Sequence, residues 1–239
     1  MKSRLLCVAA IAAAAGVASG HTTYLDPFGM SSDVDPFFLN QGFNHLDIAA
    51  VEVENESGAF NFDIVVNADI ASGTGTDWGK FLIFLDTAPG GRTDNPWGRS
   101  ITSGAEADFY IGGWADGGGG AEIYQVVGGA WTLIGATYTT FPGAGVDLSN
   151  AAGGLWNVQV DEAVFGVTPG QIIGLDVVIT AGGGGDPGVD HLSLGTVATP
   201  DWGTPSVGGA FLDYEVEPAP GSVAVLGIAG LLAGRRRRA

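Results

Sequence analysis

Residues 45–216 are built from short runs in which apolar and polar residues alternate, and turns rich in glycine or proline separate these runs. Alternation with a period of two is typical of strands, and no apolar stripe of useful length appears at helical spacing. Many short strands with frequent turns predict an all-β fold, an antiparallel β-sandwich of jelly-roll or Ig-like type. The runs that fit a strand are residues 46–53, 60–66, 81–85, 108–114, 121–127, 131–138, 155–160, 172–180 and 211–216.

Three segments of this pattern predict more specific features. Residues 81–85 are apolar throughout, which favours a central strand that is covered on both faces. Gly128 and Gly129 lie between two runs and predict a two-residue hairpin turn. Residues 21–44 are less regular, and we expect an N-terminal strand followed by a long loop. The length of residues 21–216 suits one domain with a single core.

The N-terminal residues 1–20 have the layout of a secretory signal peptide. Lys2 and Arg4 precede an apolar segment at 5–17, and the small residues Ala18 and Gly20 stand where a signal peptidase reads them. Cleavage there makes His21 the first residue of the exported protein. The only cysteine of the chain lies inside this segment, so the sequence predicts no disulfide in the exported domain.

The C-terminal residues 217–239 have the layout of a membrane segment with a basic stop. Glu217 and Pro218 lead into an uncharged stretch at 221–234, which ends in Arg235, Arg236, Arg237 and Arg238. As a helix the stretch spans about 21 Å at ~1.5 Å per residue, shorter than the ~30 Å hydrocarbon core, and the snorkelling arginines close part of the gap. The basic cluster predicts a cytoplasmic C-terminus with residues 21–216 on the outside.

This order of a Glu-Pro pair, an apolar helix and an arginine cluster resembles the PEP-CTERM sorting tail, with Val216 standing where the family has its first proline. The resemblance implies that an exosortase-type sorting enzyme of a Gram-negative bacterium acts on the chain near Glu217 and Pro218. It also implies that the helix at 221–234 holds the protein in the inner membrane at least transiently. The product is then expected at the cell surface or in the extracellular matrix.

The charge of the exported portion excludes several classes of partner. Once the signal segment and the arginine cluster are set aside, Lys80, Arg92 and Arg99 stand against 26 acidic residues, a net charge of −23. Nucleic-acid binding is excluded because no basic surface is available for phosphate. The same charge disfavours adhesion to anionic lipid.

The order of motifs in residues 45–192 resembles the DOMON-like and family-9 carbohydrate-binding-module group of β-sandwiches. The residues that carry the resemblance are an apolar strand ending in Asp86-Thr87, the loop motif at 95–99, an Ala-Asp-Phe-Tyr strand at 107–110 and the hairpin at 121–131. The resemblance implies a sandwich that binds sugar, or haem in some relatives, and it argues against an enzyme. Ser-His-Asp order, zinc-ligand spacing and phosphate-loop motifs are not evident in the sequence.

Two tryptophans are candidates for a carbohydrate platform, because sugar rings stack on aromatic faces. Trp78 and Trp97 lie in the glycine- and aspartate-rich segments that flank the strand at 81–85, where loops can present them to a ligand. The alternative is that these large side chains belong to the core. For Trp131 and Trp156, which lie inside predicted strands, the core interpretation is the better one.

Acidic residues in the loops are candidates for structural calcium, since calcium prefers oxygen ligands. Asp86 and Asp94 are the first candidates, and further acids lie around two other loops, at Asp33 and Asp35 and at Asp186 and Asp190. Solvated loop carboxylates are the alternative in so acidic a chain.

His21 at the exported N-terminus supports a further hypothesis, a copper site completed by His45 or His191, because an amine and imidazoles suit copper.

Taken together, these features of the sequence predict a non-enzymatic protein of the cell surface or matrix that binds polysaccharide. A purely structural surface protein without a ligand is the alternative, and a copper-binding redox protein is the second alternative.

Overall fold

The computed structural model describes residues 21–218. The predicted signal helix at 1–20, the apolar helix at 221–234 and the arginine cluster lie outside the described residues. Within them the longest helix is α1 (Pro36–Leu39), which begins where Asp35 Oδ1 accepts a hydrogen bond from the Phe37 amide. No helix in residues 21–218 is both long enough and apolar enough to cross a membrane.

The remaining elements are strands and single helical turns, which confirms the all-β prediction. The strands are β1 (His21–Leu25), β2 (Ile48–Glu56), β3 (Ala59–Val66), β4 (Lys80–Asp86), β5 (Ile101–Thr102), β6 (Phe109–Trp114), β7 (Gly120–Val127), β8 (Ala130–Ala136), β9 (Gly145–Asp147), β10 (Leu155–Asp161), β11 (Ile172–Thr180), β12 (Gly188–His191), β13 (Ser206–Val207) and β14 (Leu212–Glu215). The 3₁₀ turns are η1 (Gly29–Ser31), η2 (Asn44–Leu46), η3 (Asp116–Gly118), η4 (Ala151–Gly153) and η5 (Glu162–Val164).

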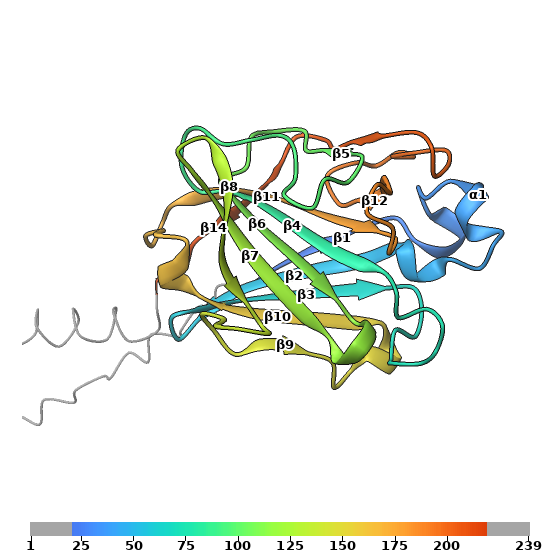
Figure 1. Cartoon of the computed structure of the whole chain (residues 1–239), viewed down its shortest axis with the longest axis horizontal. Helices are drawn as coiled ribbons and strands as arrows, with labels where there is room; N and C mark the ends of the chain where they lie inside the picture. Colours follow the sequence, from blue (N-terminus) through green and yellow to red (C-terminus); the bar gives the residue numbers. More distant parts are fainter. Residues whose placement is uncertain (1–20, 219–239) are drawn as a thin grey trace, which may run out of the picture.

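Two antiparallel sheets make up the fold, consistent with a β-sandwich (Figure 1). One sheet has the strand order β1-β2-β3-β10-β9. The other has the order β12-β11-β4-β6-β7-β8, and β14 pairs with β11. The short pair of β5 and β13 is parallel, which the sequence pattern did not predict.

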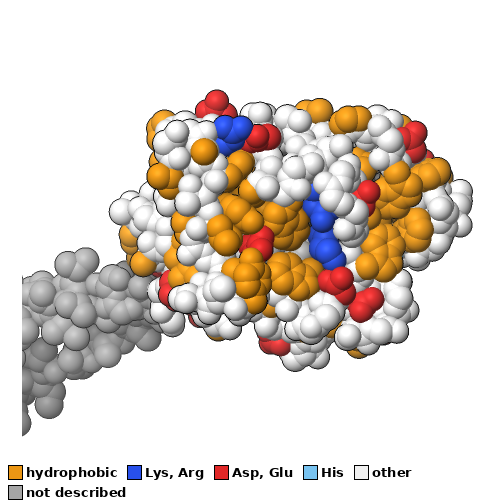
Figure 2. Space-filling view, in the orientation of Figure 1, with side chains coloured by type: hydrophobic (Ala, Val, Ile, Leu, Met, Phe, Trp, Pro, Cys, Tyr) orange, Lys and Arg blue, Asp and Glu red, His pale blue; other side chains and the backbone are white. Residues whose placement is uncertain are grey.

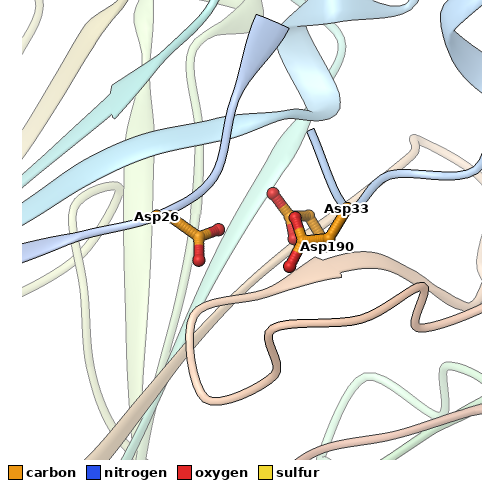
Figure 3. Close-up of side chains that lie close together, drawn as sticks. All are labelled: Asp26, Asp33 and Asp190. Atoms are coloured by element: carbon orange, nitrogen blue, oxygen red, sulfur yellow. The ribbon is translucent and has the colours of Figure 1, made fainter. Parts of the chain in front are cut away.

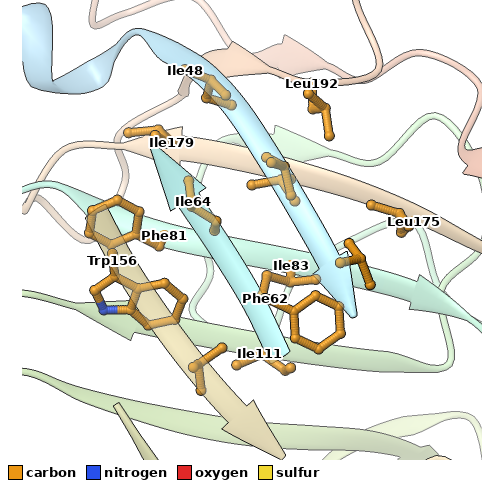
Figure 4. Close-up of a cluster of buried hydrophobic side chains, with 14 of the residues drawn as sticks. Ile48, Phe62, Ile64, Phe81, Ile83, Ile111, Trp156, Leu175, Ile179 and Leu192 are labelled. Carbon is orange, nitrogen blue, oxygen red and sulfur yellow. The ribbon is translucent and has the colours of Figure 1, made fainter. Parts of the chain in front are cut away.

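The main core lies between the two sheets, as the alternation of the strands requires. On β3, the side chains of Phe60, Phe62 and Ile64 are fully buried, while the residues between them are only partly buried. Across the core the Trp156 ring stacks on Phe81 at 4.9 Å between centroids (Figure 4). Burial of each such side chain stabilises the fold by about 1.5–3 kcal/mol, which makes this layer the main source of stability.

A second, smaller apolar cluster lies on the other face of the seven-stranded sheet. Leu82 and Phe84 of β4 and Tyr110 of β6 belong to it, together with Ile101 and Ala107 from the segment between β4 and β6. The strand β4 is therefore buried on both faces, which confirms the prediction from its continuous apolar run. The predicted hairpin is also present, since Gly128 and Gly129 connect β7 and β8 with positive φ values of 61° and 82°.

Candidate functional site: an aromatic face on the seven-stranded sheet

The outer face of β6 and β7 carries a group of aromatic side chains. In the antiparallel register, Tyr110 lies opposite Tyr124, Gly112 opposite Glu122, and Trp114 opposite Gly120. Because side chains alternate along a strand, these six positions point away from the main core. Trp97, from the segment between β4 and β5, packs onto the same cluster.

Two glycines allow indole rings to lie flat on this face. A Cβ atom at Gly112 would come within 2.4 Å of the Trp97 ring, and one at Gly120 within 2.2 Å of the Trp114 ring. The two rings therefore occupy space that any other residue would fill. Their centroids are 6.3 Å apart and their planes are inclined by 43°. Both indoles are half-buried, so part of each remains open to solvent.

Glu122 holds the aromatic side chains in place from the neighbouring strand. Its Oε2 accepts hydrogen bonds from Trp97 Nε1 and from the Tyr124 hydroxyl, both at 2.7 Å, and its Oε1 accepts one from the exposed Tyr138 hydroxyl. Burial by itself would raise the pKa of Glu122, but the three hydrogen bonds together lower it. The carboxylate therefore stays ionised and fixes the orientation of the Trp97 ring.

Basic groups border the two indoles. The guanidinium carbon of Arg99 lies 5.3 Å from the centre of the Trp97 ring, and its Nη1 donates to the carbonyls of Ala181 and Gly183 at 2.7 and 2.8 Å. Lys80, which is paired with Trp114 across β4 and β6, donates to Asp116 at 2.9 Å. Figure 2 looks onto this face and shows hydrophobic side chains gathered around a narrow basic strip with acidic groups beside it. Aromatic surface and fixed polar groups thus alternate over a short distance.

The structure does not bring the two predicted platform residues together. Trp78 is half-buried against the main core, where its ring meets His45 at 4.3 Å and Phe43 at 5.4 Å between centroids. Trp97 belongs to the separate outer cluster, and its neighbouring indole there is Trp114. Trp156 is fully buried, as expected, whereas Trp131 is only half-buried on the outer face.

The two predicted calcium ligands have different surroundings. Asp94 accepts hydrogen bonds from Arg92 at 2.5 and 2.6 Å and from Trp131 Nε1 at 3.1 Å, and the bond with Arg92 is the main cause of its lowered pKa. Asp86 borders a surface hollow of about 370 Å³ that Phe211 and Asp213 also line. Burial, and next the charge of Asp108, raises the pKa of Asp86.

The carboxylates that do converge in residues 21–218 are those of Asp26, Asp33 and Asp190. Asp33 and Asp190 stood out in the sequence only as members of two separate loops, and Asp26 did not stand out at all. These three residues could hold a metal ion.

The three histidines lie in three different environments. His21 is exposed at the start of β1, where its Nε2 lies 2.9 Å from Thr23 Oγ1 and 3.2 Å from Glu52. His45 is buried beside Trp78, with no hydrogen-bond partner for either ring nitrogen. His191 is buried with hydrogen bonds to other side chains. In the described residues, none of these contacts joins one histidine to another, as the hypothesised copper site would require.

His191 is the centre of a buried chain of hydrogen bonds that the sequence did not reveal. Its Nδ1 lies 3.1 Å from Asp176 Oδ2 and its Nε2 lies 3.0 Å from Ser206 Oγ, an Asp-His-Ser arrangement. All three residues are 0% exposed, and Ser206 Oγ also accepts a hydrogen bond from the Gly188 amide at 2.9 Å. No substrate reaches the serine in this conformation, so the chain of bonds fastens β13 to β11 and β12.

Comparisons of the chain with protein-family models, with curated proteins and with solved structures found no match.

Proposed function

We propose that the protein is an exported, non-enzymatic β-sandwich of the cell surface or extracellular matrix, and that it binds polysaccharide on the face formed by Trp97 and Trp114. The observation that supports binding is this pair of half-open indoles, both seated on glycines, with the Trp97 indole held by Glu122. The signal segment at 1–20 and the sorting tail at 217–239 support export and handling by an exosortase-type enzyme. The finer jelly-roll or Ig-like assignment belongs to the same proposal.

Stacking gives the physical reason for a sugar ligand. The C–H groups of a pyranose ring meet the negative face of an aromatic ring, while its hydroxyls need polar partners at the rim. Trp97 and Trp114 supply two partly open aromatic rings whose centroids are 6.3 Å apart, which suits neighbouring parts of one chain of sugars. The Lys80–Asp116 pair and Glu122 supply charged partners next to the rings.

A glycan array with the purified protein tests this proposal. We expect binding to a defined polysaccharide, and we expect Trp114→Ala and Trp97→Ala each to weaken it at least tenfold, equivalent to about 1.4 kcal/mol. Trp78→Ala is the matched control, because Trp78 packs on the main core at another place. Retained binding in both face variants, or equal loss in Trp78→Ala, would contradict the proposed face. Binding to no glycan would favour a purely structural surface protein.

Sorting is tested separately from binding. We expect protein recovered from cells to begin at His21 and to have lost the arginine cluster when an exosortase-type enzyme is present. Mass spectrometry of protein from cells with and without that enzyme measures both ends. An intact C-terminus in both strains would contradict the sorting part of the proposal and leave the binding part untouched.

The Asp176–His191–Ser206 arrangement supports a second candidate function, serine hydrolysis, because the order of hydrogen bonds is that of a nucleophile, base and orienting acid. Burial of all three residues argues against it. A fluorophosphonate probe distinguishes a hydrolase from a purely structural chain of hydrogen bonds. Labelling of the wild-type protein that disappears in Ser206→Ala would establish a hydrolase. We expect no labelling.

A further inference from the structure

Three carboxylates from distant parts of the chain converge in the folded protein (Figure 3). Asp26 directly follows β1, Asp33 lies between η1 and α1, and Asp190 lies on β12. One oxygen from each carboxylate lies within 4.8 Å of one from each of the others. Figure 3 shows the Asp26 side chain directed toward the other two.

The carboxylates lack the hydrogen bonds that buried groups normally have. Asp26 is only 7% exposed, and its Oδ2 has no hydrogen-bond partner. Both oxygens of Asp33 are also shielded from solvent without a partner. Asp190 is 3% exposed, and its Oδ2 accepts one bond, from the Ile48 amide at 2.7 Å. Since buried polar atoms are nearly always paired, these oxygens indicate a missing partner.

The neighbouring Asp47 shows what a self-sufficient buried carboxylate looks like in this protein. It is 0% exposed and accepts hydrogen bonds from the Gly29 amide, from Ser32 Oγ and from Asn67 Nδ2. The fold therefore supplies three donors to Asp47, whereas the adjacent group of three carboxylates has only the Ile48 amide.

No side chain of the described range supplies a positive charge to the group either. The lysine and arginine side chains of residues 21–218 all have other partners. Lys80 bonds to Asp116 and Arg92 to Asp94. Arg99 donates to the carbonyls of Ala181 and Gly183. Buried carboxylates without a counter-charge are strongly unfavourable, and in proteins they are usually paired or coordinate a metal. A metal ion placed between the three carboxylates would supply this counter-charge.

We propose that Asp26, Asp33 and Asp190 bind a calcium ion that fastens the segment from Asp26 to Asp47 to β12. Calcium is favoured over zinc or copper because the group offers oxygen ligands, and calcium accepts a flexible arrangement of carboxylates, backbone carbonyls and water. The ion joins the N-terminal segment to a strand near the other end of the described chain. This role is structural and does not depend on polysaccharide binding.

The competing arrangement is a shared proton. Burial, and next the charges of Asp33 and Asp47, raises the pKa of Asp26 to about 8. A protonated Asp26 can donate a hydrogen bond to Asp190, and no ion is then required. The two arrangements predict different responses to added calcium and to the substitution Asp26→Asn.

Calorimetry and thermal unfolding of the full-length protein, first treated with a chelator, separate the two arrangements. We expect one calcium ion to bind per chain. The unfolding midpoint should rise by about 5–10 °C when calcium exceeds its dissociation constant about 100-fold. Magnesium should produce a smaller rise, because it demands a stricter geometry.

The decisive variant is Asp26→Asn, with Asp161→Asn as the control because Asp161 is an exposed acid on β10. We expect Asp26→Asn to weaken calcium binding at least tenfold. At a pH high enough to ionise all three carboxylates, it should also raise the unfolding midpoint of the calcium-free protein, since it then removes one of the repelling charges. Asp161→Asn should change neither. If Asp26→Asn does not fold, Asp33→Asn gives the same readout. Absence of calcium binding up to about 10 mM, or a calcium response unchanged in Asp26→Asn, would overturn the proposal.

Discussion

The indole ring of Trp97 lies directly against the backbone of Gly112, where a single added methyl group would come within 2.4 Å of the ring. The next residue, Gly113, does the same on the opposite face of β6, where a methyl group would come within 2.0 Å of the Trp156 ring. Two consecutive glycines thus make β6 thin enough to hold one tryptophan of the outer face and one of the main core. Both the candidate site and the core depend on this strand.

Gly112→Ala is expected to displace Trp97 and to weaken polysaccharide binding to the extent that Trp97→Ala does. The steric conflict should also lower the free energy of unfolding by about 1–3 kcal/mol, the usual range for overpacking. Glycan binding and urea denaturation measure the two effects. Gly184→Ala is the control, because a methyl group there would have no heavy atom within 4 Å. Normal glycan affinity in a folded Gly112→Ala protein would show that the position of Trp97 does not matter.

Glu122→Gln is expected to weaken glycan binding about fivefold while the protein stays folded. The variant keeps the size of the side chain but removes the charge that holds Trp97 Nε1 and two tyrosine hydroxyls. With the Trp97 ring less firmly oriented, we expect a loss of about 1 kcal/mol in the free energy of binding, which corresponds to this factor. Calorimetric titration with the glycan found on the array measures it. Glu106→Gln, at an exposed loop position, should bind as the wild type does.

Local patterns were sufficient to predict the elements that depend only on neighbouring residues. The apolar run at 81–85 predicted a strand buried on both faces, and β4 does lie within the seven-stranded sheet with apolar clusters on either side. Gly128 and Gly129 predicted their hairpin for the same reason, because a two-residue turn is a local choice of φ.

The candidate sites depend on strand order, which local patterns do not contain. Trp97 meets Trp114 because the segment between β4 and β5 lies over the outer face of β6. The sequence instead suggested Trp78 as its partner because both flank β4. The carboxylates of Asp26, Asp33 and Asp190 come from three segments that only the folded chain joins. In the sequence each looks like an ordinary acidic loop residue. An alternation pattern gives no sign that such acids are buried.

Trp156→Phe tests the connection between the core and the outer face. Trp156 Nε1 donates a hydrogen bond to the carbonyl of Trp114 at 3.2 Å, so phenylalanine would leave that carbonyl without this donor. We expect a loss of about 1–3 kcal/mol in the free energy of unfolding, measured by urea denaturation. Trp131→Phe, on the half-buried outer face, should cost less than about 0.5 kcal/mol. Equal losses in the two variants would be inconsistent with a core role specific to Trp156.

His45 gives the fold a defined sensitivity to acid. Its imidazole is 1% exposed, neither ring nitrogen has a hydrogen-bond partner, and burial lowers its pKa to about 4, partly opposed by the charge of Asp77. In the unfolded chain the pKa of a histidine is about 6.5. Between these values the unfolded state takes up a proton that the folded state does not. The stability that neutral His45 provides is therefore complete above about pH 6.5 and is lost as the pH falls toward 4.

The loss should approach about 3 kcal/mol, since each unit of pKa difference corresponds to about 1.4 kcal/mol. Urea denaturation of the wild type and of His45→Leu, from about pH 7 to about pH 4, gives the free energy of unfolding at each pH. The loss due to His45 is the difference between the slopes of the two proteins against pH, because the carboxylates titrate in both. The control variant is His21→Gln, which replaces an exposed histidine at the start of β1. Parallel profiles for the wild type and His45→Leu would mean that His45 gains a proton without loss of the packing against Trp78.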